Sequence, residues 1–152
     1  MQHCTIYCRQ LDRVRVVTTV QSVIQTFTTE QSDSSWTNLR VAGQEGAMEI
    51  STKQFVQAGD EFTRLRFSTY MFADSSSVNC LHDKEAFLSH LESTELIIGI
   101  VVDPAFSADN RYGEIVSRIA QMLDGLIFNG EAYLTPGGEQ VAVVSPRPGQ
   151  KP

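Results

Sequence analysis

The sequence predicts an α+β protein with a ferredoxin-like sheet of the split βαβ type, extended by a C-terminal helix and a β-hairpin. Three observations lead to this prediction. Apolar residues alternate along residues 2–8, recur at spacings of three and four in two longer segments, and run without a polar side chain from Leu96 to Val102. The 152-residue chain is long enough for one core, so we expect a single domain over residues 1–144. Residues 145–152 contain three prolines and are expected to be a disordered tail or a linker.

The first strand and the first helix follow from these periods. Cys4, Ile6 and Cys8 fall on one face of an expected strand from Gln2 to Cys8. After Asp12, apolar residues trace one stripe of an amphipathic helix. The stripe consists of Val16, Val17, Val20, Val23, Ile24 and Phe27. The polar residues 28–35 are expected to form a turn.

The next segment is expected to be rich in strands. Trp36–Ala42 and Ala47–Ser51 flank a tight loop with glycine at both ends, which predicts a hairpin. Residues 53–58 are expected to form one helical turn. From Phe62 to Phe72 the high aromatic content favours a long strand.

Two further helices are expected in the second half of the chain. Asp83 is a suitable N-cap for a short helix. The buried face of this helix is expected to contain Ala86, Phe87, Leu88 and Leu91. Ser107 or Asp109 caps a longer helix, and Gly125 is expected to occupy the C′ position at its end. The apolar positions of this helix are expected to be Tyr112, Ile115, Val116, Ile119, Met122 and Leu123.

The remaining strands differ in how strongly the sequence indicates them. Leu96–Val102 has no polar alternation, which is typical of a central strand covered on both faces. We expect the helices on one face of a mostly antiparallel sheet, although this run also allows helices on both faces. Gly99 within it is expected to permit the close approach of a helix. The pair Asn129-Gly130 predicts a hairpin with a type I′ turn. The last strands are expected at residues 126–128, 132–134 and 141–144.

The charge distribution favours a protein partner over nucleic acid or a membrane. The chain has 12 Lys/Arg and 18 Asp/Glu, a net charge of −6, and residues 1–66 carry seven of each sign. The whole acidic excess therefore lies in residues 67–152. An acidic chain with no basic cluster argues against nucleic acid and anionic membranes, whereas a basic protein would suit the acidic half. The alternative is that the charge serves solubility alone.

No membrane or export segment is expected. The longest apolar run is far shorter than the roughly 20 residues that a membrane helix needs. The first residues lack the basic start and apolar stretch of a signal peptide. The sequence therefore predicts a cytoplasmic protein.

The three cysteines predict neither disulfides nor a metal site. Their odd number, in a chain without an export signal, argues against a disulfide framework. Cys4 and Cys8 are two pleats apart on one strand face, about 13 Å, which is too far for two ligands of one zinc ion. We interpret them as small core residues, and we expect no metal and no cofactor.

Candidate catalytic residues are present without a local signature. Cys80 could act as a nucleophile with His82 or His90 as its base and Asp103 behind it. Asp103 follows the most apolar strand, where a carboxylate could bind a cation or act as a base. The alternative is ordinary turn chemistry of the Asp103-Pro104 pair.

One part of the chain resembles a known group of sequences. Leu96–Phe106, then Tyr112, then Leu123–Phe128 carry the resemblance, which spans about residues 80–140. They resemble the N-terminal region of certain uncharacterised bacterial proteins of unknown function. The resemblance implies a bacterial origin and a module that precedes another domain, and it implies no catalytic residue.

The leading hypothesis is a non-catalytic protein-interaction or regulatory module that binds another protein or an adjacent domain. An antagonist of a toxin would be one specific version, and a homodimer through a sheet edge is a further possibility. This hypothesis predicts an exposed apolar or acidic patch. The alternative of a small hydrolase predicts that Asp103 converges with His82 or Cys80 at one pocket. A ligand-sensing domain would instead have an enclosed apolar pocket.

Overall fold

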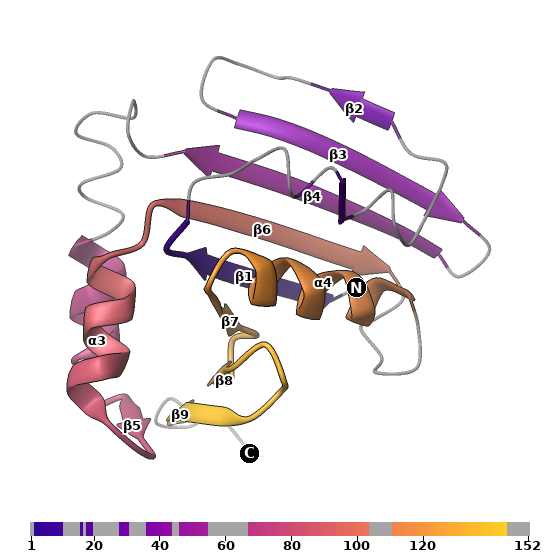
Figure 1. Ribbon diagram of the computed structural model, residues 1–152. Coiled ribbons are helices and arrows are strands. Elements are labelled where there is room, and N and C mark those ends of the chain that lie inside the picture. Colours follow the sequence, from indigo (N-terminus) through magenta and orange to yellow (C-terminus); the bar gives the residue numbers. More distant parts are fainter. Residues whose placement is uncertain are drawn as a thin grey trace.

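A computed structural model describes residues 2–10, 16, 18–19, 28–30, 36–43, 46–54, 67–103 and 111–145. Within them, one nine-stranded sheet carries helices on both faces (Figure 1). The strands are β1 (Gln2–Cys8), β2 (Thr28–Glu30), β3 (Trp36–Gly43), β4 (Gly46–Gln54), β5 (Val78–Cys80), β6 (Leu96–Asp103), β7 (Gly125–Phe128), β8 (Ala132–Leu134) and β9 (Gln140–Val144). The labelled helices are α3 (Lys84–Glu92) and α4 (Arg111–Met122), and residues 67–73 form a further helix.

The strand order is β2-β3-β4-β6-β1-β7-β8-β9-β5, and every pairing is antiparallel. The mixed α+β class and the antiparallel sheet are therefore as predicted. The ferredoxin-like arrangement is not confirmed. A split βαβ unit would place a parallel strand beside β1, whereas β6 and β7 both run antiparallel to it. The sheet is also larger than a ferredoxin-like sheet.

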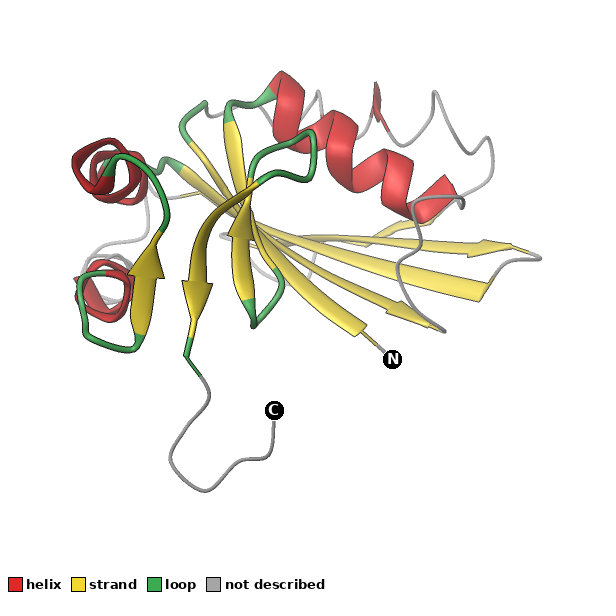
Figure 2. Ribbon diagram, turned by 90° about the horizontal axis from the view of Figure 1, so that it is seen from below, coloured by secondary structure: helices red, strands yellow, loops and turns green. Residues whose placement is uncertain are grey.

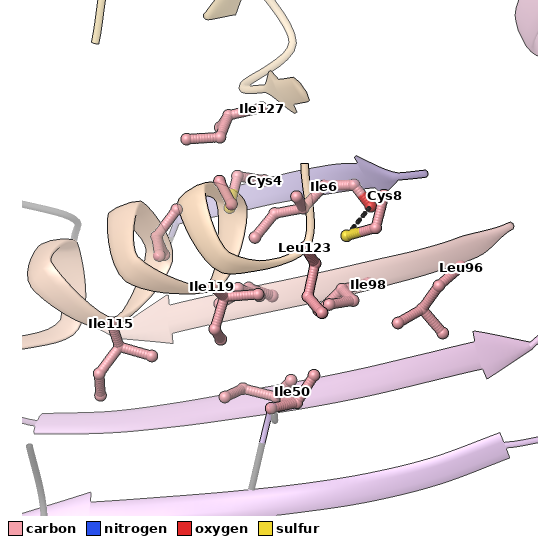
Figure 3. Close-up of a cluster of buried hydrophobic side chains, with 14 of the residues drawn as sticks. Cys4, Ile6, Cys8, Ile50, Leu96, Ile98, Ile115, Ile119, Leu123 and Ile127 are labelled. Carbon is pink, nitrogen blue, oxygen red and sulfur yellow. Dashed lines mark hydrogen bonds between the residues drawn. The ribbon is translucent and has the colours of Figure 1, made fainter. Parts of the chain in front are cut away.

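The first core cluster, here called the α4 core, lies between α4 and one face of the sheet (Figure 3). Cys4, Ile6 and Cys8 point into it from β1, which confirms the predicted period of two. Helix α4 contributes residues at the predicted spacings of three and four, except that Met122 of the expected stripe is exposed. They are Ile115, Val116, Ile119 and Ala120, with Leu123 following directly.

The second cluster, the α3 core, lies on the opposite face. Tyr7 and Ile97, which alternate with the residues of the α4 core, meet Phe87 and Leu91 of α3 there. The prediction of helices on one face was wrong, and the apolar run of β6 shows why. Helix α4 covers one face of β6, while on the other face Ile97 packs in the α3 core; Figure 2 shows α4 on one side of the sheet and α3 at its end.

The principal error of the sequence prediction concerns residues 62–72. Of this expected strand, residues 67–72 form a helix that continues to residue 73. Aromatic content favoured a strand there, but intrinsic β propensity is weaker than tertiary context. Two smaller corrections concern residues 28–30, which form β2 instead of a turn, and residues 53–54, which belong to β4 instead of a helical turn.

Three glycine predictions also need correction. The residue in the left-handed region after α4 is Asp124, with φ of 52°, and Gly125 already belongs to β7. The turn between β7 and β8 has positive φ at Gly130 alone, so the two positive φ values of a type I′ turn are not present. Gly99 permits no close approach, because a Cβ there would have no atom within 4 Å.

Several predictions lie outside the described residues. They are most of the helix after Asp12, the caps at Ser107 and Asp109, and residues 146–152. Among the helices of the described residues, none has the length and apolar character required to cross a bilayer.

Candidate functional site

Cys80 and His82 lie at the edge of the sheet formed by β5 and the end of β9. The Cys80 thiol points to the backbone carbonyl of Val141, with Sγ 3.8 Å from the oxygen. His82 faces a carboxylate instead, with its Nε2 3.7 Å from Oε1 of Glu139, and both of these side chains are largely exposed. The structure thus gives each residue a separate partner.

Asp103 is far from this edge along the sheet. It ends β6, opposite Ala47 of β4, and four strands (β1, β7, β8 and β9) lie between β6 and β5. Five strand spacings of about 4.8 Å correspond to roughly 24 Å along the sheet. The structure therefore does not bring the backbone of Asp103 to Cys80 and His82.

Cys4 and Cys8 are core residues, as predicted. Burial raises the pKa of both thiols, that of Cys4 to about 12, so neither is a thiolate at neutral pH. In the part of the chain that the structure describes, no group of three His, Cys, Asp or Glu side chains could hold a metal ion.

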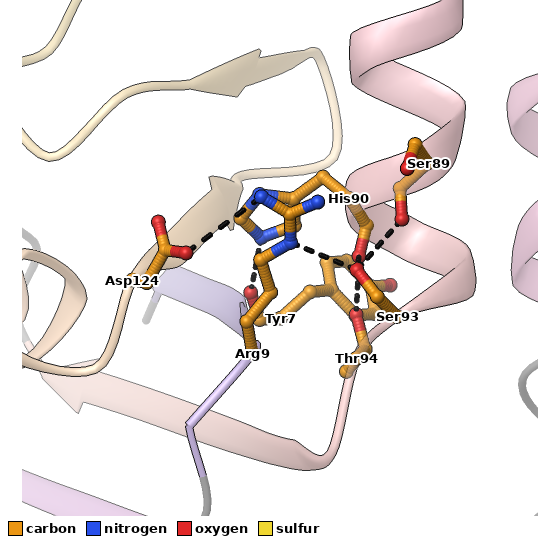
Figure 4. A network of polar contacts seen from close by, with 7 residues as sticks. All are labelled: Tyr7, Arg9, Ser89, His90, Ser93, Thr94 and Asp124. Carbon is orange, nitrogen blue, oxygen red and sulfur yellow. Dashed lines mark hydrogen bonds and ion pairs between the residues drawn. The ribbon is translucent and has the colours of Figure 1, made fainter.

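His90, the third candidate base, takes part in a polar network that joins α3 to the sheet (Figure 4). Its Nε2 lies 2.8 Å from the carbonyl oxygen of Tyr7 on β1. Because a carbonyl only accepts hydrogen bonds, this nitrogen carries the proton and donates it. Burial is the main cause that lowers the pKa of His90, and the Arg9 charge lowers it further, so the imidazole is neutral at pH 7.

Arg9 completes this network at the C-terminal end of α3. Its Nε donates to Oγ of Ser93 at 2.8 Å, and its Nη1 lies 3.7 Å from Oδ2 of Asp124. Ser93 is the C-cap of α3 and donates to the carbonyl of Ser89 at 2.7 Å. A cation at this end also complements the helix dipole. The network therefore has a structural role: it fixes the end of α3 against β1.

The helix of residues 67–73 lies beside α3 at the same end of the sheet (Figure 2). Three contacts anchor it. The side chain of Thr69 hydrogen-bonds that of Tyr7, Ala73 is buried in the α3 core, and Asp74 pairs with Lys84 at 3.1 Å. The pair joins the end of this helix to the first turn of α3.

The outward side of this helix carries three large apolar side chains together with Ser68. Phe67 and Met71, one turn apart, are 65% and 51% exposed, and Phe72 beside them is 40% exposed. We call these three residues the apolar stripe. Leu81, which follows β5, is also exposed. Of the five exposed large apolar side chains among the described residues, only Met122 lies outside residues 67–81.

Aromatic contacts connect the apolar stripe to the α3 core. The ring of Phe72 meets that of Phe128 edge-on at 6.4 Å, and Phe128 stacks on Tyr133 at 4.4 Å. Tyr133 in turn contacts Phe87 of α3 at 4.8 Å. The stripe is thus the exposed end of a packed aromatic series, which holds Phe72 in place.

Carboxylates surround the first turn of α3, next to the end of the apolar stripe. Asp83 and Glu85 flank Lys84, and both are exposed. Asp83 accepts a hydrogen bond from the backbone N–H of Ala86, which confirms the predicted N-cap. Glu139 is held near this turn by His82. We call Asp83, Glu85 and Glu139 the acidic rim.

Sequence reasoning did not find the apolar stripe. It recognised the aromatic residues of the segment but assigned them to a strand, in which Phe67 and Met71 would share a sheet face. The same spacing of four is the signature of a helix face, and this signal was available.

Comparisons of the chain with protein-family models, with curated protein sequences and with solved structures found no significant match.

Proposed function

We propose that this chain is a non-catalytic protein-interaction module that docks a protein partner on the apolar stripe. The observation that carries the proposal is the concentration of exposed large apolar side chains on one short helix. Large apolar side chains that gather on an exposed surface are typical of binding sites. Phe67, Met71 and Phe72 are also of the residue classes that are enriched in the centres of protein interfaces.

The rigidity of the surface supports the same function. Thr69, Ala73 and Asp74 fix the helix from its inner side, and Phe128 holds Phe72 from below. A preorganised apolar surface loses little conformational entropy when a partner binds, and this favours affinity. The hydrolase alternative requires Asp103 to meet Cys80 or His82 in one pocket. The backbone of Asp103 ends β6, whereas Cys80 and His82 lie at the edge formed by β5, so this alternative gains no support.

Site-specific photo-crosslinking in the source cells tests the proposal. In one variant of this protein a photoreactive phenylalanine analogue replaces Phe67. In a second variant it replaces Ser117, an exposed position on α4. We expect one protein to be crosslinked from position 67 and not from position 117, and mass spectrometry identifies it.

The identified partner is then purified and its affinity is measured. The double variant Phe67→Ser/Met71→Ser should lower the affinity about 30-fold or more, the loss expected for interface hot spots. Met122→Ser, which removes an exposed apolar side chain elsewhere, should change it less than about twofold. Equal crosslinking from positions 67 and 117, or an unchanged affinity of the double variant with its fold intact by circular dichroism, contradicts the proposed function.

A further inference from the structure

We infer that the segment docked on the apolar stripe is basic and amphipathic and comes from another protein, not from a second copy of this chain. This inference rests on the proposed function and adds the chemistry of the partner. It joins two observations at one end of the molecule: the exposed apolar side chains of helix 67–73 and the acidic rim at the first turn of α3.

The relative position of the two surfaces is fixed by an ion pair. Asp74 ends helix 67–73 and lies 3.1 Å from Nζ of Lys84. Lys84 stands between Asp83 and Glu85 in the sequence, so both carboxylates flank the residue that contacts the end of the stripe. Glu139 belongs to the same end of the molecule, because His82, two residues before Lys84, faces it.

The charge balance around the first turn of α3 is acidic. Residues 74–85 contain three Asp/Glu (74, 83 and 85) and one basic side chain, Lys84, and Glu139 adds a further carboxylate beside them. Lys84 is engaged by Asp74, so it does not neutralise the rim. His90 contributes no positive charge at pH 7, because burial lowers its pKa.

This charge selects between the two kinds of occupant. A second copy would bring its own acidic rim towards the first, and like charges at an interface oppose association. A segment with Leu-like side chains on one face and Lys or Arg beside them would cover the stripe and neutralise the rim. An amphipathic helix provides this arrangement with apolar residues at spacings of three and four.

Two synthetic peptides test the inference by fluorescence anisotropy. Each is an amphipathic helix of about four turns, about 14 residues, with leucine on one face and either lysine or glutamate on the rest. We expect the lysine peptide to bind at least about tenfold more tightly than the glutamate peptide at about 50 mM salt, with most of this preference lost at about 500 mM salt.

Variants separate the apolar from the charged contribution. Asp83→Asn/Glu85→Gln/Glu139→Gln should weaken binding of the lysine peptide about tenfold at low salt and remove most of its salt dependence. Asparagine keeps the N-cap at position 83, so α3 should remain intact. The control Glu49→Gln/Glu114→Gln neutralises two carboxylates away from the rim, on β4 and α4, and should leave binding unchanged.

The outcomes distinguish this inference from the proposed function. Equal binding of both peptides, or an effect of the control variant as large as that of the rim variant, overturns the inference while the docking function stands. A dimer in sedimentation velocity that Phe67→Ser/Met71→Ser dissociates also overturns it, because the occupant is then a second copy. Lysine-peptide binding that Phe67→Ser/Met71→Ser leaves unchanged also overturns it, since the peptide then binds by charge away from the stripe. The crosslinking experiment above tests the docking function independently of these peptides.

Discussion

Cys4 and Cys8 lie in the α4 core, where burial raises the pKa of both thiols, that of Cys4 to about 12. Thiol reactivity requires the thiolate and access of the reagent, and these two side chains lack both. Cys80 at the sheet edge is only partly buried. Cys4 and Cys8 are therefore expected to be unreactive, whereas Cys80 is accessible to a thiol reagent.

We expect a disulfide reagent such as Ellman's reagent to titrate one of the three thiols in the native protein at about pH 8, and all three after denaturation. Cys80→Ser should leave no reactive thiol in the native state. Rapid native labelling of more than one thiol would show that the α4 core opens readily.

His90 makes the stability of the protein depend on pH. Its pKa in the folded state is lowered, mainly by burial, whereas in the unfolded chain it is near the ordinary value of about 6.5. The folded state therefore binds fewer protons than the unfolded state in this range. The stabilisation is fully present above about pH 6.5 and is lost as the pH falls towards the lowered value.

Urea unfolding at several values between about pH 5 and pH 8 measures this dependence. We expect the free energy of unfolding to fall on the acid side, and His90→Gln to reduce this slope while its amide can still donate to the carbonyl of Tyr7. His82→Gln is the control for the same substitution at an exposed histidine. An unchanged slope in His90→Gln would contradict the assignment.

At the scale of elements, helix α3 depends on its N-cap. Oδ1 of Asp83 accepts from the N–H of Ala86 at 3.1 Å and satisfies a donor that the helix itself leaves free. Asp83→Ala should therefore lower the free energy of unfolding by about 1 kcal/mol, whereas Asp83→Asn should stay close to wild type. Thermal or urea unfolding measures both; equal stability of the alanine and asparagine variants would argue against the cap.

The packing of α4 against β1 depends on the absence of a side chain at Gly125. A Cβ there would lie 2.6 Å from Cγ2 of Ile6 and 3.1 Å from Cα of Ala120. Gly125→Ala should destabilise the protein by about 1–3 kcal/mol, the range for overpacked cores. Gly99→Ala on β6 is the matched control: its Cβ meets nothing within 4 Å, so stability should change by less than about 0.5 kcal/mol. Similar losses in both variants would indicate a backbone effect instead of a clash.

The elements that could be predicted are those whose burial pattern is regular along the chain. β1 alternates between two cores, β6 is apolar throughout, and α3 begins with a recognisable cap. Helix 67–73 was assigned wrongly, although the spacing of Phe67 and Met71 also fits a helix face. Its exposed face carries Phe67 and Met71, while Thr69 and Tyr70 are half-buried on its inner side, so hydrophobicity does not mark the buried face. The exposed side chains of Phe67 and Met71, which make this surface a candidate site, thus also obscured the helix in the sequence.

At the scale of the whole molecule, the two cores share one sheet. β1 supplies Ile6 to the α4 core and Tyr7 to the α3 core, so neither core can be removed without disturbing the other. The strand order that places β1 between the two cores could not be predicted from the sequence. The pairing of β1 with β6 joins segments that are far apart in the chain, and local patterns do not show which strands pair. The same reason applies to the network of His90, whose partner Tyr7 is 83 residues away.

We therefore expect the described sheet and helices to unfold in one cooperative transition. The single tryptophan, Trp36, belongs to β3 near one end of the sheet, and far-ultraviolet circular dichroism reports on the secondary structure of the whole sheet and its helices. Their urea midpoints should coincide. Separate midpoints would show that the end of the sheet carrying β3 unfolds as an independent unit.

The central position of β1 has a consequence for biosynthesis. About 90 residues separate Cys8 from Leu96, so at about 5–20 residues per second a ribosome needs roughly 5–18 s to deliver the first neighbour of β1. During this interval both edges of β1 lack their hydrogen-bonding partners and its apolar faces lack the residues of β6 that later pack beside them. β7, the second neighbour, emerges later still. Among the described strands, β1 is thus paired only after the later β6 and β7 have been made.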